Sequence, residues 1–311
     1  MPARYLIWAS ETNEMADFLH EPVLTREVVT YLAPQRGGLF VDCTVGLGGH
    51  ALALLNAGAT RVIGLDRDPA ALQLAAEALA SWRDRIELVH SDYRRLDTVL
   101  DERGIKTIDG ALADMGVSSF QLEAEGRGFS FRRDAPLDMR MDPTTGPTAA
   151  ELIQNAAESE LADVLHIHGE ERYARRIARS IVQARQAAAI RTTTQLAALV
   201  RRAIPRRGHL RIDPATRTFQ ALRIWVNREL EGIDEFLAMA VRRLNAGARL
   251  VAITFHSLED RIVKRTFRAV EHREDIAIRI LTKKPVSPQS DEVRRNPRAR
   301  SAKLRAVERL A

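Results

Sequence analysis

The chain has 311 residues, of which 45% are hydrophobic and 28% are charged. This balance is typical of a folded globular protein and excludes an intrinsically disordered chain. The length predicts about two domains. No apolar run approaches the ~20 residues that a membrane-spanning helix needs, and the run from Tyr5 to Ala9 is too short for a signal peptide. The single cysteine, Cys43, excludes an intramolecular disulfide, so we expect a cytoplasmic protein.

The net charge of +6 is unevenly distributed along the chain. Residues 1–200 contain 21 Lys and Arg against 28 Asp and Glu, whereas residues 201–311 contain 26 against 13. A basic C-terminal third is typical of a surface that binds a polyanion, most simply a nucleic acid. Only five of the 47 basic residues are lysine. An arginine-rich codon usage would explain that preference, but it would not explain the asymmetry.

Between residues 39 and 115 the sequence alternates short β-rich runs with helical stretches. The expected strands are 39–43, 61–66, 86–90 and 108–113. The first expected helix follows the glycine-rich turn and ends near residue 57, and the next two span 70–80 and 96–102. This alternation predicts βαβ units in a parallel sheet, with ligands at the carboxyl ends of the strands.

After the fourth strand the pattern changes. Residues 116–145 are rich in Gly, Pro, Ser and Arg, which predicts a long loop that is either functional or disordered. The later expected elements are a helical region at 149–203, one long helix from Thr218 to Leu244, a strand at 247–255, a helix opened by a capping box at Ser257–Asp260, and strands at 276–281 and 302–307. We therefore expect an α/β, Rossmann-like domain with a helical domain inserted after its fourth strand.

The first strand is followed by a glycine-rich turn, Gly46-Leu-Gly48-Gly49-His50. Such a turn lets the backbone approach a bound group, and the helix that follows offers free amides at its N-terminus. Acidic residues lie at the ends of all four strands, namely Asp42, Asp66, Asp92 (with Tyr93 next to it) and Asp114. Asp66 is placed to accept hydrogen bonds from ribose hydroxyls, and Asp92 with Tyr93 could bracket an adenine.

The identity of the cofactor is open at this level. The turn also matches the G-x-G-x-x-A fingerprint of dinucleotide-binding proteins, so an NAD(P)-dependent oxidoreductase is one alternative and a tight turn that binds nothing is another. A pyrophosphate beside Asp42 and Asp114 would meet carboxylates, whereas the ammonium and sulfonium groups of S-adenosylmethionine would be attracted by them. The charges favour S-adenosylmethionine.

Longer strings of the sequence resemble the bacterial 16S rRNA cytosine-N4 methyltransferases (the RsmH family, formerly MraW). They run in order from about residue 18 to the end, so the resemblance covers nearly the whole chain. The strings are His20-Glu-Pro-Val-Leu24, Asp42-x-Thr-x-Gly-x-Gly-Gly-His50, Asp66-Arg-Asp68, Asp114-Met-Gly-Val-Ser-Ser119 with Gln121, Arg127-Gly-Phe-Ser-Phe131, Pro136-Leu-Asp-Met-Arg-Met-Asp-Pro143, Gly169-Glu-Glu-Arg172, Pro214-Ala-Thr-Arg-Thr-Phe-Gln-Ala221, Phe255-His-Ser-Leu-Glu-Asp-Arg261 and Asn296-Pro-Arg-Ala-Arg-Ser301.

The resemblance implies a class I S-adenosylmethionine-dependent methyltransferase fold, with a mostly parallel seven-stranded sheet and an inserted all-helical domain. The implied segments are an N-terminal extension (1–17), a methyltransferase domain (18–125 and 215–311), and a loop with the helical substrate-recognition domain (126–214). The family transfers a methyl group from S-adenosylmethionine to the exocyclic N4 of a decoding-centre cytidine of 16S rRNA. The implied partner is therefore 16S rRNA, and we expect it to be bound within the small ribosomal subunit.

The resemblance also assigns site residues. The family's cofactor contacts fall on Gly48, Gly49, His50, Asp66, Tyr93, Asp114 and Gln121. The departures are small: Cys43 stands where the family often has a small residue, and Ala51 stands where serine is frequent. No metal is expected, because His166 and His168 lie in a helical stretch without a third ligand.

Asp114 is the candidate catalytic residue. An exocyclic cytosine amine is a poor nucleophile because its lone pair is delocalised into the ring, so the enzyme must align it and accept a hydrogen bond from it. Alignment can contribute roughly 7–11 kcal/mol, and Asp114 is the best-placed acceptor, with Ser118 weaker. The alternatives for Asp114 are a carboxylate that caps the loop or one that contacts only the cofactor. Methylation at C5 would need a cysteine near the fourth or fifth strand, and Cys43 is expected to be a buried apolar residue.

Two arginine-rich segments are candidates for contact with RNA. The loop 127–133 interleaves Phe129 and Phe131 with arginines; these rings could stack on splayed bases or tuck the loop into the core. Arg298 and Arg300, near Arg294 and Arg295, could contact phosphates or form a solvated face. For His256, contact with substrate and helix capping both stay open. A non-enzymatic ribosome-assembly factor is an alternative function. The oligomeric state stays open, and a homodimer is one alternative.

Overall fold

The computed structural model describes residues 22–205 and 213–311, which divide into two compact units. Unit 1 comprises the chain up to Gly116 together with Gly232–Ala311, and unit 2 comprises Val117–Glu231. Unit 2 is wider than the expected segment 126–214, because it also takes in the first helix after the fourth strand and the helix that follows residue 214. Residues 1–17, the expected extension, lie outside the described residues.

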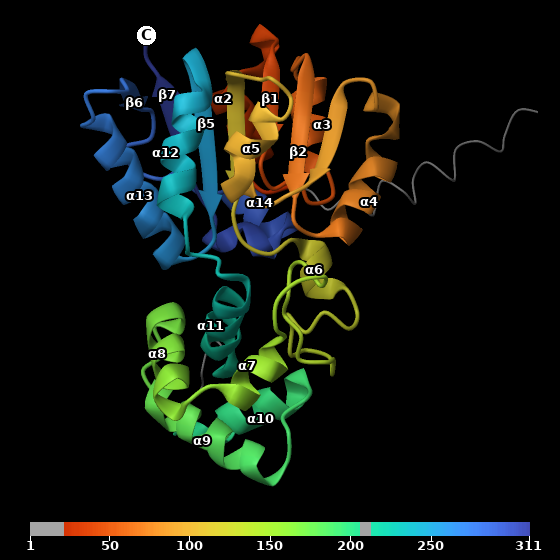
Figure 1. The fold of residues 1–311 in the computed structure, drawn as a ribbon, viewed down its shortest axis with the longest axis vertical. Helices are drawn as coiled ribbons and strands as arrows, with labels where there is room; N and C mark the ends of the chain where they lie inside the picture. The colour runs from red at the N-terminus through yellow and green to blue at the C-terminus, as the bar shows by residue number, and fades with distance from the viewer. Residues whose placement is uncertain (1–21, 206–212) are drawn as a thin grey trace, which may run out of the picture. The chain divides into compact units, whose positions relative to one another are not determined.

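Unit 1 is built on one seven-stranded sheet (Figure 1) with the strand order β3-β2-β1-β4-β5-β7-β6. The first five strands in that order are parallel, and β7 is antiparallel to both of its neighbours. The strands are β1 (Leu39–Asp42), β2 (Arg61–Asp66), β3 (Ile86–His90), β4 (Ile108–Asp114), β5 (Leu244–Thr254), β6 (Ile278–Ile280) and β7 (Lys303–Arg309). The mostly parallel sheet of the class I methyltransferase fold is confirmed.

Helices cover the sheet of unit 1. Its central strands carry apolar side chains on both faces, which is why they read as continuous apolar runs in the sequence. The α-helices are α2 (Thr25–Leu32), α3 (Gly49–Asn56), α4 (Pro69–Ala78), α5 (Leu96–Asp101), α12 (Ile233–Arg243), α13 (Ser257–Glu271) and α14 (Ser290–Arg295). Short 3₁₀ turns lie at Pro34–Arg36, Ala80–Trp82, Tyr93–Arg95 and Pro297–Ser301. Among the described residues, none of the helices combines the length and apolar character that a bilayer span requires.

Two expectations about the helices between residues 218 and 260 are wrong. The single helix expected from Thr218 to Leu244 is two helices, because Arg228 (φ 50°) and Gly232 (φ 70°) adopt left-handed conformations that end α11 and begin α12. The apolar spacing continues across this break, so periodicity does not detect it. The N-cap of α13 is His256 rather than Ser257, and the capping box pairs His256 with Glu259.

The described part of unit 2 contains helices and no strand. The helices are α6 (Ser119–Glu123), α7 (Ala149–Asn155), α8 (Glu158–Gly169), α9 (Ala174–Ala187), α10 (Thr193–Ala203) and α11 (Ala215–Asn227). Three of them begin with a capping box, at Ser118, Thr148 and Thr192. Their apolar faces form one core, to which α7 to α11 all contribute. The inserted all-helical domain is confirmed.

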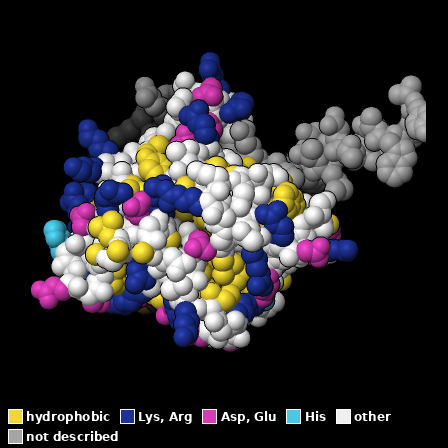
Figure 2. Space-filling view, turned by 90° about the horizontal axis from the view of Figure 1, so that it is seen from above, with side chains coloured by type: hydrophobic (Ala, Val, Ile, Leu, Met, Phe, Trp, Pro, Cys, Tyr) yellow, Lys and Arg dark blue, Asp and Glu magenta, His cyan; other side chains and the backbone are white. Residues whose placement is uncertain are grey.

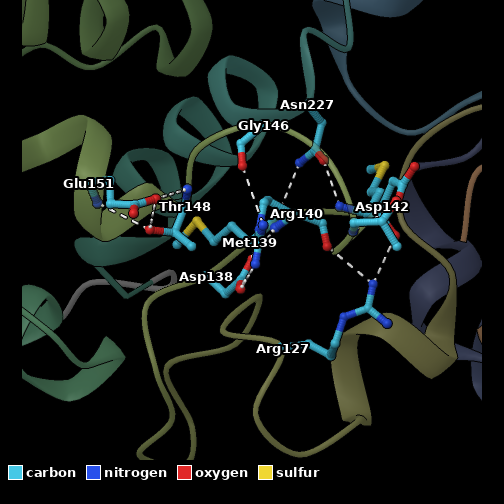
Figure 3. A network of polar contacts seen from close by, with 11 residues as sticks. Arg127, Asp138, Met139, Arg140, Asp142, Gly146, Thr148, Glu151 and Asn227 are labelled. Atoms are coloured by element: carbon cyan, nitrogen blue, oxygen red, sulfur yellow. Dashed lines mark hydrogen bonds and ion pairs between the residues drawn. The ribbon is translucent and has the colours of Figure 1, made fainter.

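The long loop between α6 and α7 is ordered by a polar network (Figure 3). The amide of Asn227, at the end of α11, donates to the carbonyl of Met139 (2.7 Å) and accepts from the backbone N–H of Met141 (2.7 Å). The guanidinium of Arg127 donates to the carbonyls of Arg140 (3.1 Å) and Met141 (2.9 Å). Buried amides and guanidinium groups hold a loop firmly because each lost partner would be costly. The alternative that this loop is disordered is therefore wrong.

Candidate functional site

The candidate site in unit 1 includes the glycine-rich turn between β1 and α3. Gly46 (φ 52°) and Gly48 (φ 89°) have left-handed conformations, and a Cβ on Gly48 would lie 2.6 Å from Cδ1 of the buried Leu79. Gly48 is also the residue that precedes α3, so the first amides of that helix follow it directly. Glycine is needed here both for the backbone conformation and for the close approach.

Asp66, at the end of β2, fixes this turn. Its Oδ2 accepts from the backbone N–H of Gly46 (2.8 Å), and its Oδ1 accepts from that of Asp68 (2.9 Å). Burial raises the pKa of Asp66, and these two hydrogen bonds oppose that rise. A carboxylate oxygen can accept more than one hydrogen bond, so Asp66 retains capacity for ribose hydroxyls while it holds the turn.

At the end of β3, Asp92 and Tyr93 have different surroundings. Asp92 is held by the guanidinium of Arg94 at 2.8 and 2.6 Å, and Arg67 lies at 3.7 Å. Burial raises the pKa of Asp92, but these cations outweigh burial and the pKa is lowered overall. The ring of Tyr93 packs against Phe236 with centroids 4.6 Å apart, and burial raises the pKa of its hydroxyl. Of this pair, Tyr93 presents an apolar ring, while the charge of Asp92 is already balanced by arginine.

The buried Asp42 and His50 and the half-buried Asp114 form a cluster beside the turn. Asp114 ends β4 and is 22% exposed, its Oδ2 lies 3.5 Å from His50 Nε2, and its backbone N–H donates to Thr44 Oγ1 (2.7 Å). Asp42 is fully buried, and its Oδ1 accepts from the N–H of Thr44 (3.2 Å). Thr44 thus links the turn to the end of β4, a role that the sequence does not indicate.

Polar atoms of this cluster lack partners among the described residues. They are Asp42 Oδ2, Asp114 Oδ1 and both ring nitrogens of His50, of which Nε2 faces Asp114 only at the ion-pair distance of 3.5 Å. Burial raises the pKa of Asp42 to about 7. Burial lowers the pKa of His50, but the negative charges of Asp114 and Asp42 outweigh it and raise the pKa overall. Buried carboxylate oxygens without partners are costly, and a bound cation would relieve that cost.

The remaining candidate residues have other roles in the structure. Gln121 belongs to unit 2, where it is buried and forms the capping box of α6 with Ser118. His256 caps α13 and its Nε2 lies 3.1 Å from Glu259 Oε1, so capping is what the structure shows for this residue. Cys43 is 1% exposed, which confirms it as a buried residue, and burial raises the pKa of its thiol.

The two phenylalanines of the arginine-rich loop are both packed in unit 2. Phe129 is 7% exposed within the helical core, and the Arg127 guanidinium lies 5.9 Å from its ring. Phe131 is half-buried, packs edge-on against Phe219 at 4.7 Å, and has Arg201 5.6 Å from its ring. The packing favours the core alternative for Phe129, and leaves part of the Phe131 ring accessible.

Arg298 and Arg300 lie in the 3₁₀ turn Pro297–Ser301 of unit 1. Asn296 caps this turn by accepting from the N–H of Arg298 (3.2 Å), and the buried Ala299 anchors it. Arg300 is exposed, whereas Arg298 is half-buried. Contact of these residues with RNA stays a prediction.

Comparison with known proteins identifies the family. A family model described as the MraW methylase family matches residues 17–310. Proteins called ribosomal RNA small subunit methyltransferase H are similar over most of their length: that of Geotalea uraniireducens is 47% identical over 95% of this chain and 100% of the relative. Those of Nitrosococcus oceani (48%, covering 96% and 99%) and of a Synechococcus strain (52%, covering 94% and 92%) agree. The chain, with its glycine-rich turn and carboxylates at the strand ends, belongs to the MraW methylase family.

Proposed function

We propose that this protein transfers a methyl group from S-adenosylmethionine to the exocyclic N4 of a decoding-centre cytidine of 16S rRNA, within the small ribosomal subunit. Membership of a methylase family supports the reaction class, and the names of the relatives support small-subunit rRNA as the substrate. The observation that carries the proposal is the pair of unpartnered carboxylate oxygens on Asp42 and Asp114 at the glycine-rich turn.

These residues fit the proposed cofactor by charge. S-adenosylmethionine supplies an activated methyl group on a sulfonium, and its sulfonium and ammonium charges are attracted by the carboxylates of Asp42 and Asp114. A dinucleotide pyrophosphate would be repelled by the same groups. Gly48, Gly49 and His50 would let the backbone approach the bound molecule, Asp66 would accept from the ribose, and Tyr93 would offer its ring to the adenine. The family resemblance also assigns a cofactor contact to Gln121, which belongs to unit 2.

Asp114 accepts the proton in this proposal. S-adenosylmethionine would supply the methyl group and leave as adenosylhomocysteine, and the cytosine N4 that gains the methyl group would lose one proton to Asp114. Asp114 Oδ1 has no partner among the described residues, so it is able to hydrogen-bond the amine and localise its lone pair. General-base assistance of this kind contributes typically 10²–10⁴-fold. The buried Cys43 takes no part, because transfer to an amine needs no covalent intermediate.

The test is methyl transfer from labelled S-adenosylmethionine into small ribosomal subunits that lack the modification, with mass spectrometry of the product nucleoside. We expect N4-methylcytidine. A different methylated nucleoside would contradict the target assignment but leave the reaction class intact. No incorporation, with adenosylhomocysteine still bound, would favour a non-enzymatic assembly factor.

A further inference from the structure

The sequence from Arg172 to Pro205 contains eight arginines and no aspartate, glutamate or lysine. This segment spans α9 and α10 of unit 2. The net charge of residues 1–200 does not reveal this basic segment, because acidic residues earlier in that range offset its arginines. Surface charges of both signs are normally interspersed, so a segment of this length with one sign needs a physical explanation.

Three arginines lie on one side of α9, and Arg172 comes immediately before its N-cap residue, Tyr173. The opposite side of the helix is buried through Ala174, Ile177, Ala178 and Ile181. The exposed side carries residues at spacings of three and four, which places them next to one another on the helix surface. We call this set the α9 arginine face; its members are Arg172, Arg175, Arg176 and Arg179.

The α9 arginine face is poorly neutralised by the protein itself. Arg179 lies 3.4 Å from Glu158, and both side chains are largely exposed. Within the described ranges, Arg172, Arg175 and Arg176 form no ion pair with a carboxylate. The buried Glu171 accepts instead from the backbone N–H of Tyr173 (2.8 Å).

The position of these charges is also unfavourable for the helix. The first turn of α9 contains no acidic residue, and cations near a helix N-terminus are disfavoured by the helix dipole by about 0.3–1 kcal/mol each. Folding alone therefore gives no reason for Arg175 and Arg176. A bound polyanion would reverse the sign of this effect.

The composition of the segment indicates which part of a nucleic acid it binds. Residues 174–205 contain no aromatic residue and no histidine, so α9 and α10 themselves offer no ring on which an unpaired base could stack. The neighbouring Tyr173 is partly buried against the core of unit 2, and Arg172 lies 5.9 Å from its ring. Single-stranded sites use such rings, whereas base-paired RNA is bound through its phosphates and 2′-hydroxyls. Guanidinium groups bind phosphate with two parallel hydrogen bonds.

We propose that the α9 arginine face binds the phosphate backbone of base-paired rRNA next to the methylated nucleotide. The proposal rests on the proposed function for its substrate, and adds where and how unit 2 holds it. The contact is independent of sequence, so it contributes affinity and orientation, while the choice of nucleotide is made elsewhere.

The test compares two double variants of the full-length chain. R175Q/R176Q removes two charges from the α9 arginine face. The matched control, R242Q/R273Q, also removes two arginine charges, from residues of unit 1 that are exposed and paired with Asp275 at 3.2 and 2.8 Å. Fluorescence anisotropy over a range of salt concentrations gives the affinity of each protein for an RNA hairpin of arbitrary sequence and for an unpaired strand of equal length.

We expect the wild-type chain to bind the hairpin more tightly than the unpaired strand. Each phosphate contact contributes about 0.9 to the slope of log affinity against log salt concentration, by analogy with B-DNA. R175Q/R176Q should therefore lower that slope by about 2 and weaken hairpin binding about tenfold or more at low salt, while the control changes little. With small subunits as substrate, KM should rise and kcat at saturation should stay near wild type.

Three results would overturn the proposal: equal loss in the control variant, an unchanged slope in R175Q/R176Q, or wild-type binding to the unpaired strand that is as tight as to the hairpin. Retained affinity for adenosylhomocysteine, measured by calorimetry, shows that unit 1 of the variant is folded, and an unchanged circular dichroism spectrum shows that the helices of unit 2 are intact. The binding assay does not depend on methyl transfer. Absence of transfer together with the expected hairpin binding would therefore contradict the proposed function alone.

Discussion

Unit 1 and unit 2 both carry many charged side chains, but the groups on which the two proposals rest have opposite charge and differ in burial. In unit 1, surface arginines lie beside carboxylates, as in Arg61 with Glu87 (2.6 Å) and Arg279 with Glu308 (2.7 Å). Figure 2 shows acidic side chains interspersed among lysines and arginines on one face of the molecule. Among the described residues, carboxylates at the strand ends of unit 1 have buried oxygens without a hydrogen-bond partner, whereas the α9 arginine face of unit 2 has exposed cations of which only Arg179 lies near a carboxylate.

The difference matches the charges of two ligands. A small cation that is enclosed by protein needs buried carboxylates, since electrostatic interactions are strong where water is excluded. A large polyanion needs exposed cations, since it remains partly hydrated and displaces counterions. The comparison therefore supports the proposed cofactor site in unit 1 and the proposed RNA surface in unit 2, and a specific substitution can test each of them.

The largest effect is expected from D114N. This change keeps the shape of the side chain but removes the proton acceptor, so methyl transfer should fall by about 10²–10⁴-fold, while adenosylhomocysteine still binds. The measurement is single-turnover methyl transfer with calorimetry of ligand binding. D101N, at an exposed carboxylate paired with Arg243, is the control. Normal transfer by D114N would exclude Asp114 as the base.

The second effect is a dependence of stability on pH. The pKa of Asp42 rises from 3.8 to about 7 on folding, so the native state binds more protons than the unfolded state between about pH 4 and pH 7. Stability without ligand should therefore fall as pH rises through that window, by up to about 4 kcal/mol for the full shift. The raised pKa of His50 acts in the same direction near and above its ordinary value of 6.5.

Urea unfolding at pH 5 and pH 8 measures this effect, with D42N as the comparison. We expect D42N to lose most of the pH dependence and to bind S-adenosylmethionine more weakly. Equal pH dependence in D42N and wild type would show that Asp42 does not titrate in this window.

The third effect concerns the glycine-rich turn. G48A places a side chain at φ 89° and close to Leu79, which should cost about 1–3 kcal/mol of stability and weaken cofactor binding. G104A is the matched control, because Gly104 also has positive φ (65°) but no atom within 4 Å of the added Cβ. Urea unfolding and ligand calorimetry should show a larger loss for G48A in both quantities. Equal losses would mean that the close approach is unimportant.

The smallest effect tests how unit 2 recognises RNA. If Phe129 serves the core, F129L should cost less than about 1.5 kcal/mol of stability and leave RNA affinity unchanged. If its ring stacks on a base, F129L should weaken RNA binding by about 1–3 kcal/mol. Fluorescence anisotropy with a single-stranded RNA fragment distinguishes the two alternatives. A loss of RNA affinity of that size would support base stacking by Phe129.

Much of unit 1 could be predicted from the sequence. The strands 61–66 and 86–90 have the expected bounds, and 39–43 and 108–113 differ by one residue. These strands are short apolar runs in alternation with helices, a pattern that depends on local sequence. The positions of Gly48, Asp66 and Asp114 follow from the same alternation, because parallel strands end at one edge of a sheet.

Local sequence by itself determined the strands, the helices, the glycine-rich turn and the acidic residues that follow the strands, since each depends on neighbours along the chain. Tertiary structure decided what distant residues do to one another. Burial of Asp42 raised its pKa, packing placed Phe129 in a core, and the left-handed turn at Arg228 divided one apolar stripe into two helices. It also decided which arginines meet carboxylates, because ion pairing depends on side chains brought together in space rather than on composition.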